Sequence, residues 1–200
     1  MIRSRSVFSI SVHKWSLAGF VLGILLFLSA CNNKPEKESP AYFPVISFLN
    51  DQVRYVDSLQ LPVQKLTTVN NQTDTVLIDI AEFKRLANEF TTPDINDPAL
   101  QKDYTENSFA DQTINSVTLT YSAKKRELPL QRLDVIIHPD PVLDDRVQSI
   151  YMEKGEQVKD TTILKKLYWK ANQNFQIITI RQSGLVAVSS VIKVVWNGGY

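Results

Sequence analysis

The sequence is short of the residues from which most enzyme sites are built. It has two histidines, His13 and His138, and a single cysteine, Cys31. One cysteine excludes an internal disulfide, and so few nitrogen and sulfur ligands argue against a zinc site. The six glycines form neither a Walker loop nor a dinucleotide-binding fingerprint. No Gly-x-Ser-x-Gly elbow is present either, which argues against a serine hydrolase of that type.

The first thirty residues have the three parts of a secretory signal. Residues 1–14 carry Arg3, Arg5 and Lys14 and no acidic residue, and residues 15–30 carry no charge at all. A basic start, an apolar core and small residues before a break are typical of an export signal. The uncharged run is shorter than the roughly 20 residues that cross a bilayer comfortably. We therefore expect a cleaved signal peptide at residues 1–30 rather than a permanent transmembrane helix.

The uncharged run ends in Leu28-Ser29-Ala30-Cys31. These four residues resemble the lipobox of bacterial lipoproteins. The resemblance implies that the Cys31 thiol takes a diacylglycerol, that the signal is cut before it, and that the new amino terminus is acylated. Each buried methylene of an acyl chain adds about 0.8 kcal/mol of membrane affinity, so several chains anchor firmly. The alternative, an ordinary unpaired cysteine, leaves the only thiol of an exported chain unexplained.

The residues after Cys31 bear on where such a lipoprotein would be held. Asn32 stands where an aspartate would resemble the inner-membrane retention signal of enteric bacteria. The resemblance therefore implies the outer membrane, with the body on its periplasmic face. Lys34 and the charged run 36–38 resemble the surface-export tethers of Bacteroidota lipoproteins, which gives the cell surface as the alternative. Residues 31–40 contain nothing apolar enough to bury and predict a flexible tether.

The charge balance argues against nucleic acid as a partner. The chain has 22 basic and 21 acidic residues, and three of the basic residues belong to the signal. The mature chain would thus have 19 basic and 21 acidic residues, a formal charge of −2. Nothing in this balance supplies the basic stripe that neutralises phosphates. The partners we expect are the membrane, through lipid on Cys31, and an envelope protein.

Residues 41–200 predict one α+β domain. Apolar residues at helical spacing predict a helix over 44–59, and Asp79 with Glu82 forms a capping box that opens a second helix over 79–90. Strands are expected at 61–69 and 75–79, around the turn Asn70-Asn71-Gln72. Residues 93–115 are polar and turn-rich, with a short helix opening at Asp97-Pro98.

The C-terminal half predicts an antiparallel sheet meander. Strand patterns occupy residues 117–121, 133–137 and 147–152, and a turn is expected at Glu153-Lys154-Gly155-Glu156. The last forty residues hold three strand patterns, 163–170, 175–181 and 185–196, with turn residues between them. Closely spaced strands of this kind pair antiparallel. The fold class predicted is therefore α+β, with the two N-terminal helices packed on one face of the C-terminal sheet.

Two acidic segments were considered as cation sites. Asp94-Ile-Asn96-Asp97 matches the start of a calcium loop, but Pro98 and Ala99 stand where the pattern needs a ligand and a glycine. A second group lies in a Pro-rich turn, where aspartates commonly cap the backbone. It comprises Asp140, Asp144 and Asp145. Neither segment is expected to bind a metal.

The remaining candidates each have a plain structural explanation. His138 precedes Pro139 at a strand end, where an exposed histidine is usual, and substituting it by alanine should leave the function nearly intact. The basic run Lys124-Lys125-Arg126 predicts a solvated hairpin tip, with contact to lipid headgroups or anionic envelope polymers as the alternative. Strand aromatics suggest a stacking platform but are more often core residues. They are Tyr151, Tyr168, Trp169, Phe175 and Trp196.

Three functions follow from these observations. The first is a membrane-anchored, non-catalytic interaction or assembly module of the cell envelope, without cofactor. The second is a carrier or sensor that binds a small apolar or glycan ligand in a groove between sheet and helices. The third is a hydrolase whose paired carboxylates act without histidine. An aromatic-lined pocket would favour the second, and two carboxyl groups facing across a cleft would favour the third.

Overall fold

The computed structural model describes residues 41–139 and 146–197, which form one compact unit. The predicted signal peptide, the lipidation site Cys31 and the tether 31–40 lie outside the described residues, as do Asp140, Asp144 and Asp145. No helix in the described part of the chain is long and apolar enough to cross a membrane. The elements are α2 (Val45–Ser58), β1 (Val63–Val69), β2 (Gln72–Ile78), α3 (Ile80–Ala87), η1 (Asn88–Phe90), α4 (Pro98–Gln101), β3 (Tyr104–Asp111), β4 (Ser116–Ala123), β5 (Leu130–His138), β6 (Arg146–Val158), β7 (Thr161–Lys170), β8 (Asn174–Ser183) and β9 (Val186–Val195).

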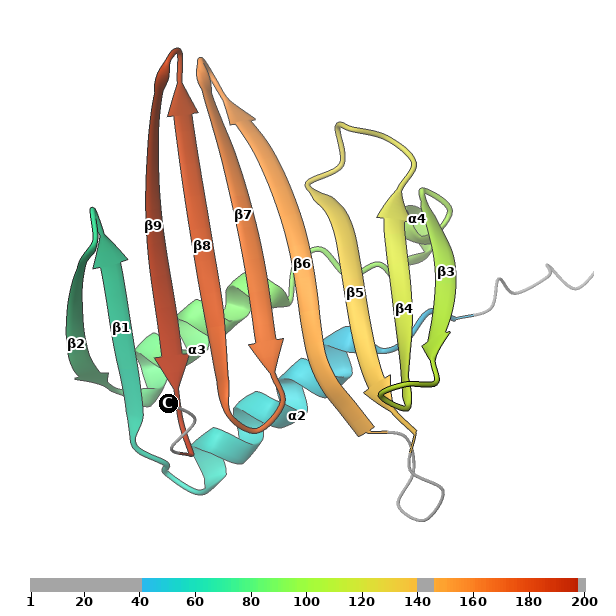
Figure 1. The fold of residues 1–200 in the computed structure, drawn as a ribbon, viewed down its shortest axis with the longest axis horizontal. Helices are drawn as coiled ribbons and strands as arrows, with labels where there is room; N and C mark the ends of the chain where they lie inside the picture. Colours follow the sequence, from blue (N-terminus) through green and yellow to red (C-terminus); the bar gives the residue numbers. More distant parts are fainter. Residues whose placement is uncertain (1–40, 140–145, 198–200) are drawn as a thin grey trace, which may run out of the picture. The chain divides into compact units, whose positions relative to one another are not determined.

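Nine antiparallel strands form a single sheet in the order β2-β1-β9-β8-β7-β6-β5-β4-β3 (Figure 1). Strands β3 to β9 follow one another as a meander, and the β1–β2 hairpin joins the far edge by pairing β1 with β9. The predicted meander is confirmed, but the sheet also contains strands from outside the C-terminal half of the chain. It includes both N-terminal strands and β3, so the fold is mainly β rather than an even mixture of helix and sheet.

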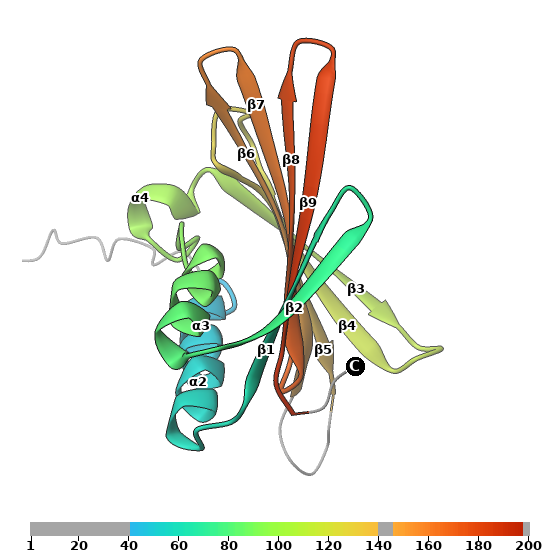
Figure 2. The ribbon, with the colours of Figure 1, turned by 90° about the vertical axis from the view of Figure 1, so that its left-hand side faces the viewer.

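The two N-terminal helices lie on one side of the sheet (Figure 2). Helix α2 buries Val45, Leu49 and Val56, a spacing of three to four residues that puts them on one stripe. Helix α3 begins as its sequence predicts, because the Asp79 carboxylate accepts a hydrogen bond of 2.8 Å from the Glu82 amide. The other side of the sheet has no described helix over it.

Aromatic rings fill the space between the helices and the middle strands. Trp169 and Phe175 stack with ring centroids 4.9 Å apart, and Phe90 meets Trp169 edge to face at 5.2 Å. Phe83 of α3 meets Trp196 in the same way at 5.4 Å. All five rings are at most 1% exposed. The predicted core role of Trp169, Phe175 and Trp196 is confirmed.

Three tyrosines hold the segment that precedes α2 against the β3 edge of the sheet. The Tyr42 hydroxyl donates to the Tyr104 carbonyl at 3.0 Å, and its ring lies 4.8 Å from that of Tyr121. The Phe43 amide donates to the Tyr121 hydroxyl at 3.0 Å. These contacts hold the segment before α2 against β3 and β4.

Two predictions about the strands were wrong. Residues 153–156 were predicted as a turn, but they lie inside β6, paired with both β5 and β7 at Lys154. The turn comes later, at Lys159, whose φ is 53°. Residues 104–111 were assigned to a polar loop, yet they form the edge strand β3. An edge strand with only one neighbour can be polar on both faces, which hides it from periodicity.

Candidate interaction surface

The sequence-predicted sites are dispersed and already engaged. His138 ends β5 and is exposed, as predicted. Asp94 and Asp97 hydrogen-bond the amides of Asn96 and Ala99, both at 2.9 Å, so they cap the backbone. The described residues hold no group of three or more His, Cys, Asp or Glu side chains that could bind a metal.

The predicted basic hairpin tip lies between β4 and β5. Lys125 forms an ion pair of 2.8 Å with Asp103, and this contact lowers the pKa of the Asp103 carboxyl. The Lys124 ammonium donates to the Lys102 carbonyl at 2.5 Å. Two of the three basic residues of this tip are therefore bound within the fold.

The aromatic platform divides between the two faces of the sheet. Successive residues of a strand point to opposite faces, so Tyr168 points away from its buried neighbour Trp169. Tyr168 is 38% exposed whereas Trp169 is fully buried. Tyr151 pairs directly with Tyr168 across β6 and β7 and is half-buried. The two tyrosines therefore lie together on the face without helices.

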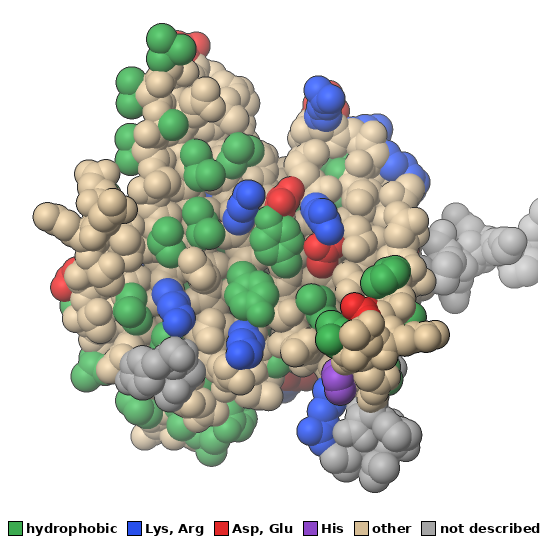
Figure 3. All heavy atoms as spheres, viewed as in Figure 1, with side chains coloured by type: hydrophobic (Ala, Val, Ile, Leu, Met, Phe, Trp, Pro, Cys, Tyr) green, Lys and Arg blue, Asp and Glu red, His purple; other side chains and the backbone are tan. Residues whose placement is uncertain are grey.

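Lysines surround this tyrosine pair. Lys166 and Lys170 lie two residues before and after Tyr168 on the same face of β7. Lys193 of β9 is in register with Tyr168 through Gln176 of β8. Figure 3 looks onto this face and shows basic and large hydrophobic side chains gathered over the middle strands. We call this set, Tyr151, Tyr168, Lys166, Lys170 and Lys193, the tyrosine–lysine face.

The two acidic residues beside the lysines, Asp134 and Glu153, already accept hydrogen bonds from Arg132 and from Tyr151 of the face itself. The Arg132 guanidinium contacts both oxygens of Asp134, at 3.0 and 2.9 Å. The Tyr151 hydroxyl donates to Glu153 at 2.5 Å, and burial together with this carboxylate raises the pKa of Tyr151 to about 12. Both carboxylates are engaged, so we assign them no acid–base chemistry.

The three lysines of the tyrosine–lysine face have no such partners. Over residues 41–139 and 146–197, none of Lys166, Lys170 and Lys193 forms an ion pair. The helical segments 41–60 and 79–103, by contrast, contain eight acidic and four basic residues. The helical layer therefore carries excess negative charge, whereas the open face sets these three lysines and Arg132 beside Asp134 and Glu153.

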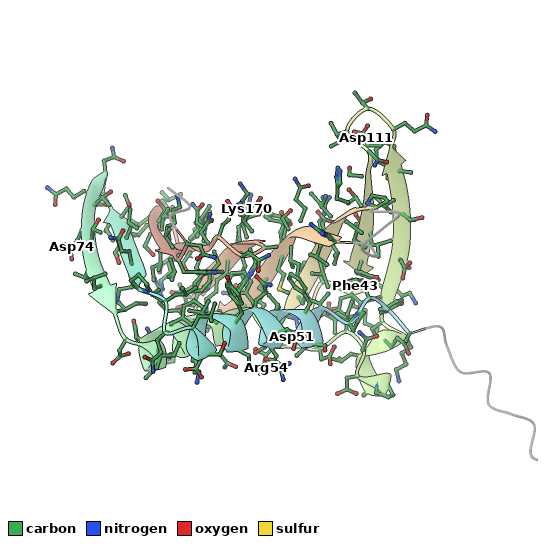
Figure 4. The ribbon with its side chains drawn as sticks, turned by 90° about the horizontal axis from the view of Figure 1, so that it is seen from below. Phe43, Asp51, Arg54, Asp74, Asp111 and Lys170 are labelled. Carbon is green, nitrogen blue, oxygen red and sulfur yellow. The ribbon has the colours of Figure 1, made fainter. Side chains whose placement is uncertain are left out.

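The open face of the sheet is curved, and we call this curved face the trough. Seen from below, the β1–β2 and β3–β4 hairpins rise at its two sides, away from α2, and Lys170 lies between them (Figure 4). One cross-strand row runs from Leu77 on β2 through Lys170 to Phe109 on β3. Leu77 is 72% exposed and Phe109 is 66% exposed. The trough thus has apolar side chains on its walls and the tyrosine–lysine face on its floor.

Sequence reasoning singled out both tyrosines but missed the lysines. The signal was available in Lys166-Leu-Tyr168-Trp-Lys170, where polar and apolar residues alternate with the period of a strand. Lys193 could not have been placed without the pairing of β8 and β9. Neither a protein family, nor a curated protein, nor a solved structure matches the chain.

Proposed function

We propose that the protein is a lipid-anchored, non-catalytic interaction module of the bacterial cell envelope, and that its trough binds an acidic segment of another envelope protein. Lipid on Cys31 would hold it to the periplasmic face of the outer membrane. The observation that carries the proposal is the tyrosine–lysine face, which sets around two tyrosines three lysines that form no ion pair within residues 41–139 and 146–197.

The chemistry of the trough favours a protein partner. Tyrosine is enriched in protein interfaces and supplies many of their energetic hot spots, and the lysine charges would attract an acidic partner. Nine strands spaced about 4.8 Å apart make the sheet roughly 38 Å wide, enough for an interface of standard size. A flat bilayer surface fits less well, because Lys170 lies between two raised hairpins (Figure 4).

The first experiment compares two positions for a photo-crosslinking amino acid in living cells. One replaces Tyr168 in the trough, and the control replaces Arg54 on α2, whose side chain is 77% exposed. We expect capture of one envelope protein from position 168 and none of it from position 54. Capture of a second copy of this chain, or of no protein, would contradict the proposal.

The second experiment tests whether charge attracts the captured protein. Lys166→Glu should abolish the crosslink, and Arg54→Glu, the same charge change on the helical layer, should leave it intact. An acid-to-lysine substitution in the captured protein should then restore the crosslink to Lys166→Glu. Loss of capture in both variants, or failure of every such substitution to restore it, would refute recognition through the trough.

A carrier function is a second candidate, supported by a different part of the molecule. The space between the helices and the middle strands is filled by aromatic rings, so no groove is left there for a ligand. A pocket does lie beyond the aromatic core, where η1 meets β6 and β7.

A further inference from the structure

This pocket lies on the helix side of the sheet and has a volume of about 430 Å³. That size is within the range of small-molecule sites. Its apolar wall includes Pro93, Pro129 and Ile163, and its polar lining includes Lys154 and Lys165. None of these residues belongs to the tyrosine–lysine face.

The two pocket lysines are direct cross-strand neighbours on β6 and β7. Like charges placed directly opposite each other destabilise a sheet unless something compensates them. Lys165 is compensated, since its ammonium donates to both oxygens of Glu89 at 2.9 and 2.8 Å. Lys154 has no carboxylate of its own and donates instead to the backbone carbonyls of Glu89 and Thr92.

This arrangement suits an uncharged amine at Lys154. A neutral amine has two N–H groups, and the two carbonyls take both, which leaves its lone pair free. Burial lowers the pKa of Lys154 to about 8; Glu89 opposes the shift and Lys165 adds to it. The other charged group in the pocket lining is the exposed Glu156 on β6 itself, while Pro129 before β5 and the segment after η1 contribute uncharged residues.

We propose that Lys154 captures small apolar aldehydes in this pocket as a reversible imine. Lysines made nucleophilic by desolvation or by a neighbouring cation commonly form such adducts with carbonyl compounds. The proposal is independent of the protein partner in the trough, because it uses the opposite face of the sheet.

The reaction balances without an oxidant or reductant. The lone pair of Lys154 Nζ attacks the aldehyde carbon, and a proton passes from nitrogen to oxygen to give a carbinolamine. The ammonium of Lys165 then donates a proton to the hydroxyl group, which leaves as water while the carbon–nitrogen double bond forms. Loss of water gives a protonated iminium, whose nitrogen returns its proton to the now neutral Lys165 and so becomes the imine. Hydrolysis reverses every step and releases the aldehyde.

The test traps the imine in the intact protein with hexanal and cyanoborohydride, followed by peptide mapping of each lysine. At pH 7 an amine of pKa 8 is neutral about 10% of the time, against about 0.03% for an ordinary lysine. Allowing for restricted access, we expect labelling of Lys154 at least ~10-fold faster than of the exposed Lys166. Equal rates at pH 7 would overturn the proposal without any variant being needed.

Two further measurements separate a reactive pocket from a merely structural lysine. The rate advantage of Lys154 should shrink as the pH rises through about 10, because every lysine then becomes neutral. Ile163→Trp should fill the pocket and slow labelling at Lys154 while leaving Lys166 unchanged. Undiminished labelling in that variant, or a pH-independent ratio, would show that the pocket does not direct the reaction.

Discussion

The two faces of the sheet are built from the same strands but use their side chains differently. On the helix side, aromatic rings from four elements are packed against each other and exclude water. On the open side, side chains of similar size stand among lysines that form no ion pair within the described part of the chain. Tyr168 and Trp169, which are neighbours on β7, therefore have different surroundings: Tyr168 lies among the lysines and Trp169 lies in the aromatic core. If the open face binds a partner as proposed, stability and recognition can be altered separately in this fold.

The largest difference in stability between the two faces is expected when Trp169 and Tyr168 are each replaced by alanine. Trp169→Ala should lower the free energy of unfolding by about 3–5 kcal/mol, because it leaves a cavity in the aromatic core. Tyr168→Ala should cost under about 1 kcal/mol, since the ring is exposed. Urea denaturation of both variants measures the difference. Similar losses would mean that the open face is also part of the stabilising core.

A smaller loss of stability is expected when the N-cap residue of α3, Asp79, is replaced. Asp79→Ala should cost about 1 kcal/mol, because the Glu82 amide loses its hydrogen-bond acceptor. Asp74→Ala removes an exposed acid from β2 and serves as the matched control. If both variants unfold at the same urea concentration, the cap does not stabilise the helical layer.

The third prediction concerns how the stabilising effect of Glu82 on the helix side depends on pH. Hydrogen bonds from Arg85 and Lys65 lower the pKa of Glu82 to about 2. A lowered folded-state pKa gives stability that is present above the ordinary value near 4.5 and is lost as the pH falls toward 2. Glu82→Gln should therefore be less stable than the parent at pH 7, by about 0.5–1 kcal/mol for so accessible a group.

The measurement is the unfolding free energy of parent and Glu82→Gln between pH 7 and pH 2. The difference in unfolding free energy between the two proteins should become smaller as the pH falls toward 2. A constant gap would assign the loss to packing of the amide rather than to charge.

The smallest effect is expected at His138. Its side chain is exposed at the end of β5, so His138→Ala should change stability by less than about 0.5 kcal/mol. Crosslinking from position 168 should be unaffected, in contrast to its loss in Lys166→Glu. If His138→Ala also abolishes capture while the protein stays folded, recognition extends beyond the trough floor.

The sequence predicted local structure well wherever one residue type controls the backbone. Asp79 with Glu82 predicted the start of α3, and the structure has the corresponding capping hydrogen bond. Asn70 and Asn71 both adopt positive φ, 49° and 62°, in a turn that asparagine tolerates better than most residues. Helix α2 was found from its apolar spacing. In each case the information lies within a few residues of the feature it determines.

Features that depend on partners far along the chain were not predictable. The pairing of β1 with β9 joins residues more than 120 positions apart, and no local pattern encodes it. The polar strand β3 exists because β4 lies beside it. Residues 153–156 carry turn-like residues, but pairing on both sides keeps them extended. Both proposed sites also depend on such pairings: the one between β8 and β9 places Lys193, and the one between β6 and β7 sets Lys154 opposite Lys165.

The tyrosine contacts at the start of the described chain have a mechanical consequence. If lipid on Cys31 fixes one end of the protein, a pull on a partner bound in the trough enters the fold at Tyr42 and Phe43. A few hydrogen bonds that involve side chains hold these residues: Tyr42 donates to the Gln101 and Tyr104 carbonyls, and Phe43 donates to Tyr121 and accepts from Asn96. The trough floor, in contrast, is joined along whole strands. Under load the tyrosine contacts should yield first, releasing the segment before α2 while the sheet stays intact. The released residues would lengthen the tether, so the module could follow a moving partner without letting go of it.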